Sequence, residues 1–135
     1  MPAHITGHIT SADWKELPAG PAGTTPRLAR ASVTNTFSGG IEADGTTCEY
    51  TIVHGTEKTG GFTGMELLAG RLEGREGSFV VEQRGTFAAD GTVHSTFEVV
   101  PGTGTGELTG LTGTGAFTYA PGESSFPYTF DYDLG

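Results

Sequence analysis

The residue types that could carry chemistry are few, and the first of them is Glu66. In an extended segment Glu66 lies on the same face as Phe62 and Leu68, so a carboxylate interrupts an apolar row. A carboxyl group in apolar surroundings has a raised pKa and can act as a general acid or base. The alternative, which is the commoner situation for glutamate, is a carboxylate at the rim of the fold or in an ion pair with Arg84 or Arg71.

Trp14 and Glu16 lie two residues apart near the start of the chain, where they could form one wall of a pocket and its acid. The alternative is an aromatic plug that closes one end of the fold. Gln83 shares a face with Phe79 and Val81 in a second extended segment. This glutamine could bind a polar group of a ligand, or it could be a hydrogen-bonded core residue.

Cys48 and Tyr50 share one face of a predicted strand with Ile52 and His54. A thiol, a phenol and an imidazole on one strand could line a cavity and bind a ligand, although cysteine is more often a small buried hydrophobic residue. Cys48 is the single cysteine of the chain, which excludes an intrachain disulfide and a cysteine-based zinc site.

The 4 histidines of the chain do not predict a metal site. His4 and His8 would share one face of a helix, but in a strand they lie about 13 Å apart. The glycine-rich segments lack the spacing of a phosphate-binding loop, and no helix is predicted after them. We therefore expect no metal and no cofactor.

The chain has 135 residues and a formal net charge of -9, from 16 acidic and 7 basic side chains. Such a negative field repels nucleic acid and anionic membrane surfaces, so neither is expected as a partner. No apolar run approaches the ~18 residues of a membrane-spanning helix, and the N-terminal residues lack the apolar core of a signal peptide. The sequence predicts one soluble, cytoplasmic domain over residues 1–135.

Alternating apolar and polar residues predict about eight strands and no helix of useful length. The segment 126–134 is the clearest, and its aromatic row either lines the core or forms an oligomer face. An Asp-Gly pair predicts a turn at 43–45, and three prolines predict the longest loop at 17–26. The other predicted strands cover 5–14, 28–37, 46–54, 62–72, 78–87 and 92–100, with shorter strands inside 101–117.

Glycine and threonine dominate residues 101–117. Each interior glycine would cost a helix about 1 kcal/mol relative to alanine, so we expect a short strand, a bend and a second short strand, with no helix. The motif Gly-x-Leu-x-Gly-x-x-Gly begins at Gly106 and also at Gly70, which suggests two similar corners. A sheet that bends this sharply closes on itself, and we predict an antiparallel barrel.

Residues 77–85 (GSFVVEQRG) and 104–113 (GTGELTGLTG) resemble the C-terminal signature of the allene oxide cyclase and dirigent barrels. The whole chain resembles a widespread bacterial family of uncharacterised small proteins built on that barrel. The shared features are the Trp-Lys-Glu start at 14–16, the Gly-Arg-x-Gly-Ser-Phe motif at 74–79 and the Pro-Gly-x-Gly-Thr-Gly-Glu-Leu run that begins at Pro101.

This resemblance implies a closed antiparallel barrel of about eight strands, similar to allene oxide cyclase, that associates into homo-oligomers, either dimers or trimers. The plant cyclases use a buried glutamate, a cysteine and an asparagine-held water in the barrel mouth. Glu16 lies in the matching region after the first strand, but its flanking residues differ, and the register of Cys48 against the family cysteine is not defined by the sequence. Cyclase activity is therefore implied by analogy alone.

Two functions follow. The first is a barrel that binds a small apolar or aromatic metabolite, and its ligand-binding candidates are Trp14, Cys48, Tyr50 and Gln83. The second is a cofactor-free cyclase or isomerase, and its general acid or base candidates are Glu16 and Glu66. A cavity of about 300 Å³ or more with a buried carboxylate favours the enzyme, and the same cavity without one favours binding. A filled interior favours neither, as in a purely structural oligomer.

Overall fold

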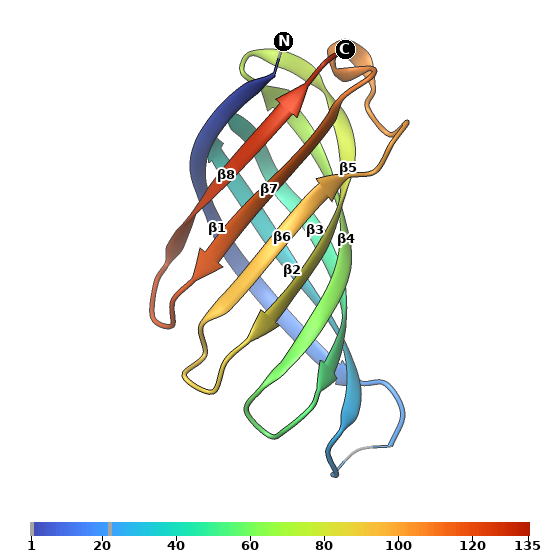
Figure 1. Cartoon of the computed structure of the whole chain (residues 1–135), viewed down its shortest axis with the longest axis vertical. Coiled ribbons are helices and arrows are strands. Elements are labelled where there is room, and N and C mark those ends of the chain that lie inside the picture. Colours follow the sequence, from blue (N-terminus) through green and yellow to red (C-terminus); the bar gives the residue numbers. More distant parts are fainter. Residues whose placement is uncertain (1, 22) are drawn as a thin grey trace.

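A computed structural model describes residues 2–21 and 23–135, and these form eight antiparallel strands that close into one barrel (Figure 1). Each strand pairs with the next along the chain, and the last strand returns to pair with the first. The predicted closed antiparallel barrel of about eight strands is confirmed. The strands are β1 (Ala3–Pro18), β2 (Arg27–Gly39), β3 (Ile41–His54), β4 (Gly60–Leu72), β5 (Arg75–Phe87), β6 (Val93–Val99), β7 (Thr112–Tyr119) and β8 (Ser125–Asp133).

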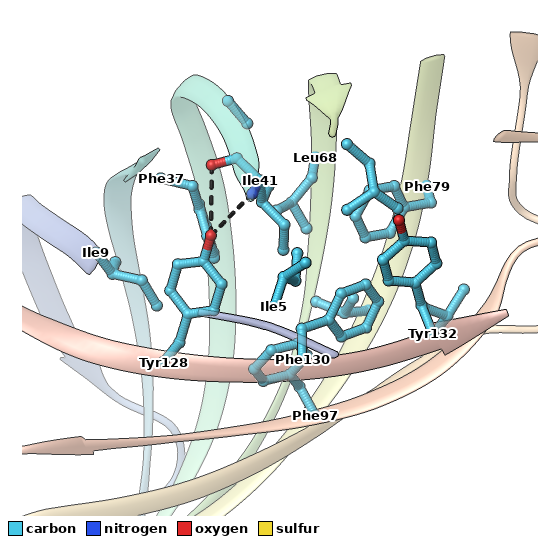
Figure 2. Close-up of a cluster of buried hydrophobic side chains, with 14 of the residues drawn as sticks. Ile5, Ile9, Phe37, Ile41, Leu68, Phe79, Phe97, Tyr128, Phe130 and Tyr132 are labelled. Atoms are coloured by element: carbon cyan, nitrogen blue, oxygen red, sulfur yellow. Dashed lines mark hydrogen bonds between the residues drawn. The ribbon is translucent and has the colours of Figure 1, made fainter. Parts of the chain in front are cut away.

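Strand β8 shows how the sequence pattern fills the barrel. Phe126, Tyr128, Phe130 and Tyr132 are each at most 6% exposed, whereas the residues between them are exposed. The aromatic row therefore lines the core, and the alternative that it forms an oligomer face is wrong. Figure 2 shows the Tyr128 ring reaching across the interior, where its hydroxyl oxygen accepts a hydrogen bond from the backbone N–H of Ile41 at 2.9 Å.

Residues 101–117 differ in part from the prediction. The first part forms no strand: it is a loop with one 3-10 turn, η1 (Gly106–Leu108), and the extended part is β7. The expected first strand and the expected absence of any helix are therefore wrong. The physical reason is burial, because the loop covers one end of the barrel and Leu108 and Leu111 are at most 1% exposed.

Strand β5 anchors this loop. The Thr105 N–H donates to the carbonyl oxygen of Ser78 at 2.9 Å, and the Thr105 hydroxyl oxygen accepts from the Ser78 N–H at 3.0 Å. The Thr103 hydroxyl oxygen accepts in the same way from the Val80 N–H at 3.1 Å. Gly77 permits this close approach, since a Cβ atom there would collide with the Thr105 carbonyl oxygen.

The predicted turn at 43–45 is also wrong. Strand β3 runs through these residues without reversing, and Gly45 has a φ of 64° beside an irregularity in the pairing of β3 with β4. The Asp-Gly pair therefore makes a bulge rather than a hairpin, and the chain reverses at Gly39 and Gly40 instead. The predicted loop at 17–26 includes residue 22, which lies outside the described residues; β1 extends to Pro18 and β2 begins at Arg27.

A second bulge, in β1, decides which residues face the interior. Ala12 pairs with Thr34 and Lys15 pairs with Ser32, so two residues of β1 stand opposite one of β2. The extra residue is Asp13, with a φ of 58°. If Asp13 were instead paired as a regular strand residue, Glu16 would fall on the outer face of the barrel, because side chains alternate along a strand. With it, Glu16 lies opposite the buried Ala31.

The two ends of the barrel differ. The termini and the 100–111 loop lie at the upper end in Figure 1, and the hairpin loops that follow β3, β5 and β7 lie at the lower end. The larger buried cluster extends from Leu72 and Leu108 at the upper end to Phe117 and Phe126 at the lower end. Within the described residues, no helix is long and apolar enough to cross a membrane.

Candidate functional site

The lower end of the barrel holds a cavity of about 710 Å³. The last residues of β1, β3, β5 and β7 contribute to its wall, together with the first residues of β4, β6 and β8. Aromatic rings dominate the lining, and they come from Trp14, Tyr50, Phe62, Phe87, Phe117, Tyr119 and Phe126.

The rings of the wall pack against one another. Tyr50 lies between Trp14, with ring centroids 6.1 Å apart, and Phe62, with centroids 5.0 Å apart in an edge-to-face arrangement. Phe126 contacts Tyr119 edge to face at 5.5 Å on the opposite side. Such contacts hold large side chains in place, so the cavity has a defined shape without a ligand.

A carboxylate and an imidazole meet at this cavity. Nε2 of His54 lies 2.9 Å from Oε2 of Glu16, and the two side chains are 12% and 31% exposed. The short contact places the imidazole proton on Nε2, since the carboxylate can only accept. Nδ1 of His54 is buried and has no hydrogen-bond partner among the described residues.

Glu66 lies in the wall farther from the lower end of the barrel than the cavity, with 1% of its surface exposed. Its carboxylate accepts hydrogen bonds from Nδ2 of Asn35 at 2.9 Å, the Thr46 hydroxyl at 2.5 Å and Nε2 of Gln83 at 2.7 Å. Burial raises the pKa of Glu66 above its usual 4.5, and the three hydrogen bonds oppose that rise.

The alternative of a rim carboxylate or an arginine ion pair for Glu66 is wrong. Arg71 binds Glu76 at 3.0 Å, and the closest carboxylate to Arg84 is that of Glu82 at 4.0 Å. Both arginines are on the outside of the barrel, while Glu66 faces inward with its neutral donors. Glu66 is therefore a buried acid without a cationic partner, which is costly and uncommon.

The network around Glu66 extends to two hydroxyl groups at the cavity. The Tyr50 hydroxyl donates to Oε1 of Gln83 at 2.7 Å, and the Ser11 hydroxyl donates to Oδ1 of Asn35 at 2.6 Å. Both amides use their NH₂ groups on Glu66, so only their oxygens remain for Tyr50 and Ser11. The carboxylate thus fixes the direction of every hydrogen bond up to the cavity wall.

Cys48 is fully buried beside this network. Burial, and then the nearby charge of Glu66, raise the pKa of its thiol to about 12. The group therefore stays a protonated thiol at neutral pH, which fits a small buried side chain rather than a nucleophile.

The structure brings four of the predicted site residues to one cavity: Trp14, Glu16, Tyr50 and Gln83 all line it. Cys48 and Glu66 lie deeper in the wall and do not line it.

Asn35 is missing from the candidates predicted from the sequence, and His54 is among the predicted cavity residues without its partner Glu16. Asn35 interrupts the apolar face of β2 in the same way as Glu66 interrupts that of β4, so the signal was present. The sequence predicts the correct face of β3 for His54, but only the bulge in β1 brings Glu16 to it. In the described part of the chain, no three His, Cys, Asp or Glu side chains gather closely enough to hold a metal ion.

Comparisons with known proteins identify a family for most of the chain. Residues 5–132 match the family model described as "Protein of unknown function (DUF3224)". The chain is similar to a protein with unknown function from that family, from Shewanella oneidensis MR-1, whose crystal structure is known. The two are 32% identical, the match covers 100% of this chain and 99% of that one, and the TM-score is 0.75. Among curated proteins, none matches the chain.

Proposed function

Since the chain belongs to the DUF3224 family, whose function is unknown, we propose from its geometry that the barrel binds a small apolar or aromatic molecule at its lower end. The observation that carries this proposal is the aromatic cavity of about 710 Å³. Ligand sites in proteins typically have volumes of about 300–1,000 Å³, mostly apolar walls and a few placed polar groups. Here the polar groups are Tyr50, Ser11 and the Glu16–His54 pair.

Binding is favoured over catalysis by the position of the buried acid. Glu66 is the carboxyl group with a raised pKa, but Gln83 and Asn35 separate it from the cavity. A general acid or base must come within hydrogen-bond reach of the proton that it transfers. Glu66 therefore supports the wall, and a ligand meets Tyr50 and Ser11 instead.

The binding proposal is tested with phenylbutanol, a neutral molecule with a phenyl ring at the end of its chain. Titration calorimetry should show saturable binding to the intact protein. Val93→Phe, which fills space inside the cavity, should weaken it at least about tenfold. Val53→Phe is the matched control, because Val53 is 42% exposed and does not line the cavity. Equal affinities for the two variants would show that phenylbutanol binds elsewhere and would contradict the proposal.

The second candidate, a cofactor-free cyclase or isomerase, is supported by one observation. Glu16 lines the cavity, and its hydrogen bond to His54 holds the carboxylate in one orientation. In this candidate Glu16 takes a proton from a carbon next to a ketone and returns it, so that no oxidant or cofactor is needed. The resemblance of the sequence to the allene oxide cyclases, which implies cyclase activity by analogy alone, would support this candidate.

Deuterium exchange tests the second candidate. Benzylacetone, a ketone with a phenyl ring, is incubated with the protein in heavy water and followed by NMR. Faster exchange at the carbons beside the carbonyl, lost in Glu16→Gln, is the expected result. Exchange at the rate of buffer alone would rule out proton transfer from such ketones.

A further inference from the structure

Apart from the imidazole of His54, the ionisable side chains that line the cavity are all acidic. Asp13, Glu16 and Glu123 line it, and no lysine or arginine does so among residues 2–21 and 23–135. The small number of basic residues in the chain is not enough to explain why lysine and arginine are missing from the cavity lining. A second hollow, of about 660 Å³, lies over the outside of β1 to β5, and its lining includes Lys15, Arg30, Arg84, Glu49 and Glu82. The basic side chains of these strands thus lie at the outer hollow rather than at the cavity.

The hydroxyl groups at the cavity wall also present negative polarity. Tyr50 donates its proton to Gln83 and Ser11 donates its proton to Asn35, because both amides are oriented by Glu66. With those protons directed into the wall, each oxygen offers only lone pairs to a ligand. The hydroxyl oxygens of Tyr50 and Ser11 therefore meet the cavity as acceptors.

The aromatic rings add a third feature of the same kind. The face of an aromatic ring carries negative potential and attracts cations within about 6 Å of its centre. Tyr50 and Trp14 are neighbours, with centroids 6.1 Å apart and planes inclined at 36°. Glu16 follows Trp14 on the same strand and lines the same cavity.

From these three features we infer that the ligand is an organic cation: a protonated amine carried on an apolar or aromatic body. Its ammonium group would lie between the Glu16 carboxylate and the rings of Trp14 and Tyr50, and its N–H groups would meet acceptor oxygens. The net charge of -9 would also raise the local concentration of cations around the barrel. This inference rests on the proposed function, because it names the ligand class for the same cavity.

The same wall disfavours carboxylate ligands such as fatty acids. A bound carboxylate would face three acidic side chains and acceptor oxygens, without a lysine or arginine to pair with it. A neutral alcohol falls between the two, since it can donate one hydrogen bond but gains nothing from the charges.

Three probes with one apolar body test the inference: phenylbutylamine, phenylbutanol and phenylbutyrate, each with a terminal phenyl ring. Titration calorimetry at neutral pH should rank their affinities amine, alcohol, acid. The amine should bind about tenfold or more tightly than the acid. Added salt should weaken binding of the amine and leave that of the alcohol almost unchanged.

Glu16→Gln identifies the group responsible. The substituted amide keeps an oxygen for His54 but loses the charge, so the amine should bind about fivefold to tenfold more weakly and the alcohol as before. Glu98→Gln is the matched control, because Glu98 is exposed on β6 and does not line the cavity. Glu123→Gln provides the same comparison if the first variant does not fold.

The outcomes separate the two proposals. Equal affinities for amine and alcohol, or tighter binding of the acid, would overturn the cation inference while leaving ligand binding in place. A failure of all three probes to bind would contradict both the inference and the proposed function. An amine preference that survives in Glu16→Gln and Glu123→Gln would also overturn the inference, because the carboxylates would not be its cause.

Discussion

Replacing Glu66 with glutamine should make the barrel more stable relative to wild type as the pH rises. Glutamine has nearly the same shape but does not ionise, so it mimics the protonated acid. In wild type, burial raises the folded-state pKa of Glu66 above 4.5. The stability that Glu66 contributes is therefore complete below about pH 4.5 and is lost as the pH rises through the folded-state pKa.

The magnitude follows from linkage. Each unit by which the pKa is raised corresponds to about 1.4 kcal/mol of stability lost by wild type across the window. The variant can keep the network, because the Gln83 amide can turn over and accept from the new NH₂ group. Its Tyr50 neighbour then accepts instead of donating. Hydroxyls can rotate freely, so this rearrangement leaves no buried group without a partner.

A second variant separates the charge from the hydrogen bonds. Glu66→Leu removes both, and it leaves the NH₂ groups of Asn35 and Gln83 buried without acceptors. Each such group costs about 1–3 kcal/mol, or about 2–6 kcal/mol in total. The Thr46 hydroxyl escapes this cost, because it can donate to the Asn35 carbonyl oxygen at 3.3 Å.

Urea unfolding provides the assay, with midpoints compared at constant slope at about pH 4 and about pH 8. Glu98→Gln on the outer face supplies the baseline for the loss of one carboxylate. We expect the stability of Glu66→Gln minus that of wild type to increase with pH. A difference that decreases with pH would mean that the three hydrogen bonds outweigh burial, and the raised pKa attributed to Glu66 would be wrong.

Three further predictions concern the bulge in β1, the loop that packs on β5, and Cys48. Deleting Asp13 should remove the extra residue of the bulge and leave Trp14 and Glu16 on the inward face, so the circular dichroism spectrum and phenylbutanol binding should both persist; loss of binding in a folded variant would contradict the assignment of Asp13 as the extra residue. Gly77→Val should displace the 100–111 loop, expose Leu108 and lower the free energy of unfolding by roughly 3 kcal/mol in urea, and an unchanged midpoint would contradict the close packing of the loop on β5. Cys48 should react with a thiol reagent at neutral pH only as fast as the protein unfolds; rapid reaction would contradict its buried, high-pKa environment.

The barrel could be predicted because its signals are local. In β8 the apolar side chains alternate strictly with exposed residues, and the same rule places Glu66 and Gln83 on inward faces. The 101–111 segment could not be predicted, because its glycines exclude a regular helix without saying what replaces it. Its path depends on hydrogen bonds to Ser78 and Val80, more than twenty residues away.

The site was less predictable than the fold because it depends on register. Glu66 can be recognised as an inward acid from β4 alone, but its partners come from β2, β3 and β5. Their alignment is determined by bulges, such as the one near Gly45, that no alternation pattern reveals. The Asp13 bulge has the same effect on Glu16, since counting by twos along β1 would place it outside.

The destabilising burial of Glu66 can be understood from its hydrogen bonds to groups at the neighbouring cavity. A leucine and apolar neighbours would fill this part of the wall with less penalty, since a buried charge without a cationic partner is expensive. The Glu66 carboxylate orients the side-chain amides of Gln83 and Asn35 so that their oxygens accept hydrogen bonds from Tyr50 and Ser11. The two hydroxyl oxygens then present lone pairs to the cavity. The polarity of the proposed ligand site is thus determined by a group that does not line the cavity, and the stability lost by burying Glu66 orients the groups that would distinguish donors from acceptors.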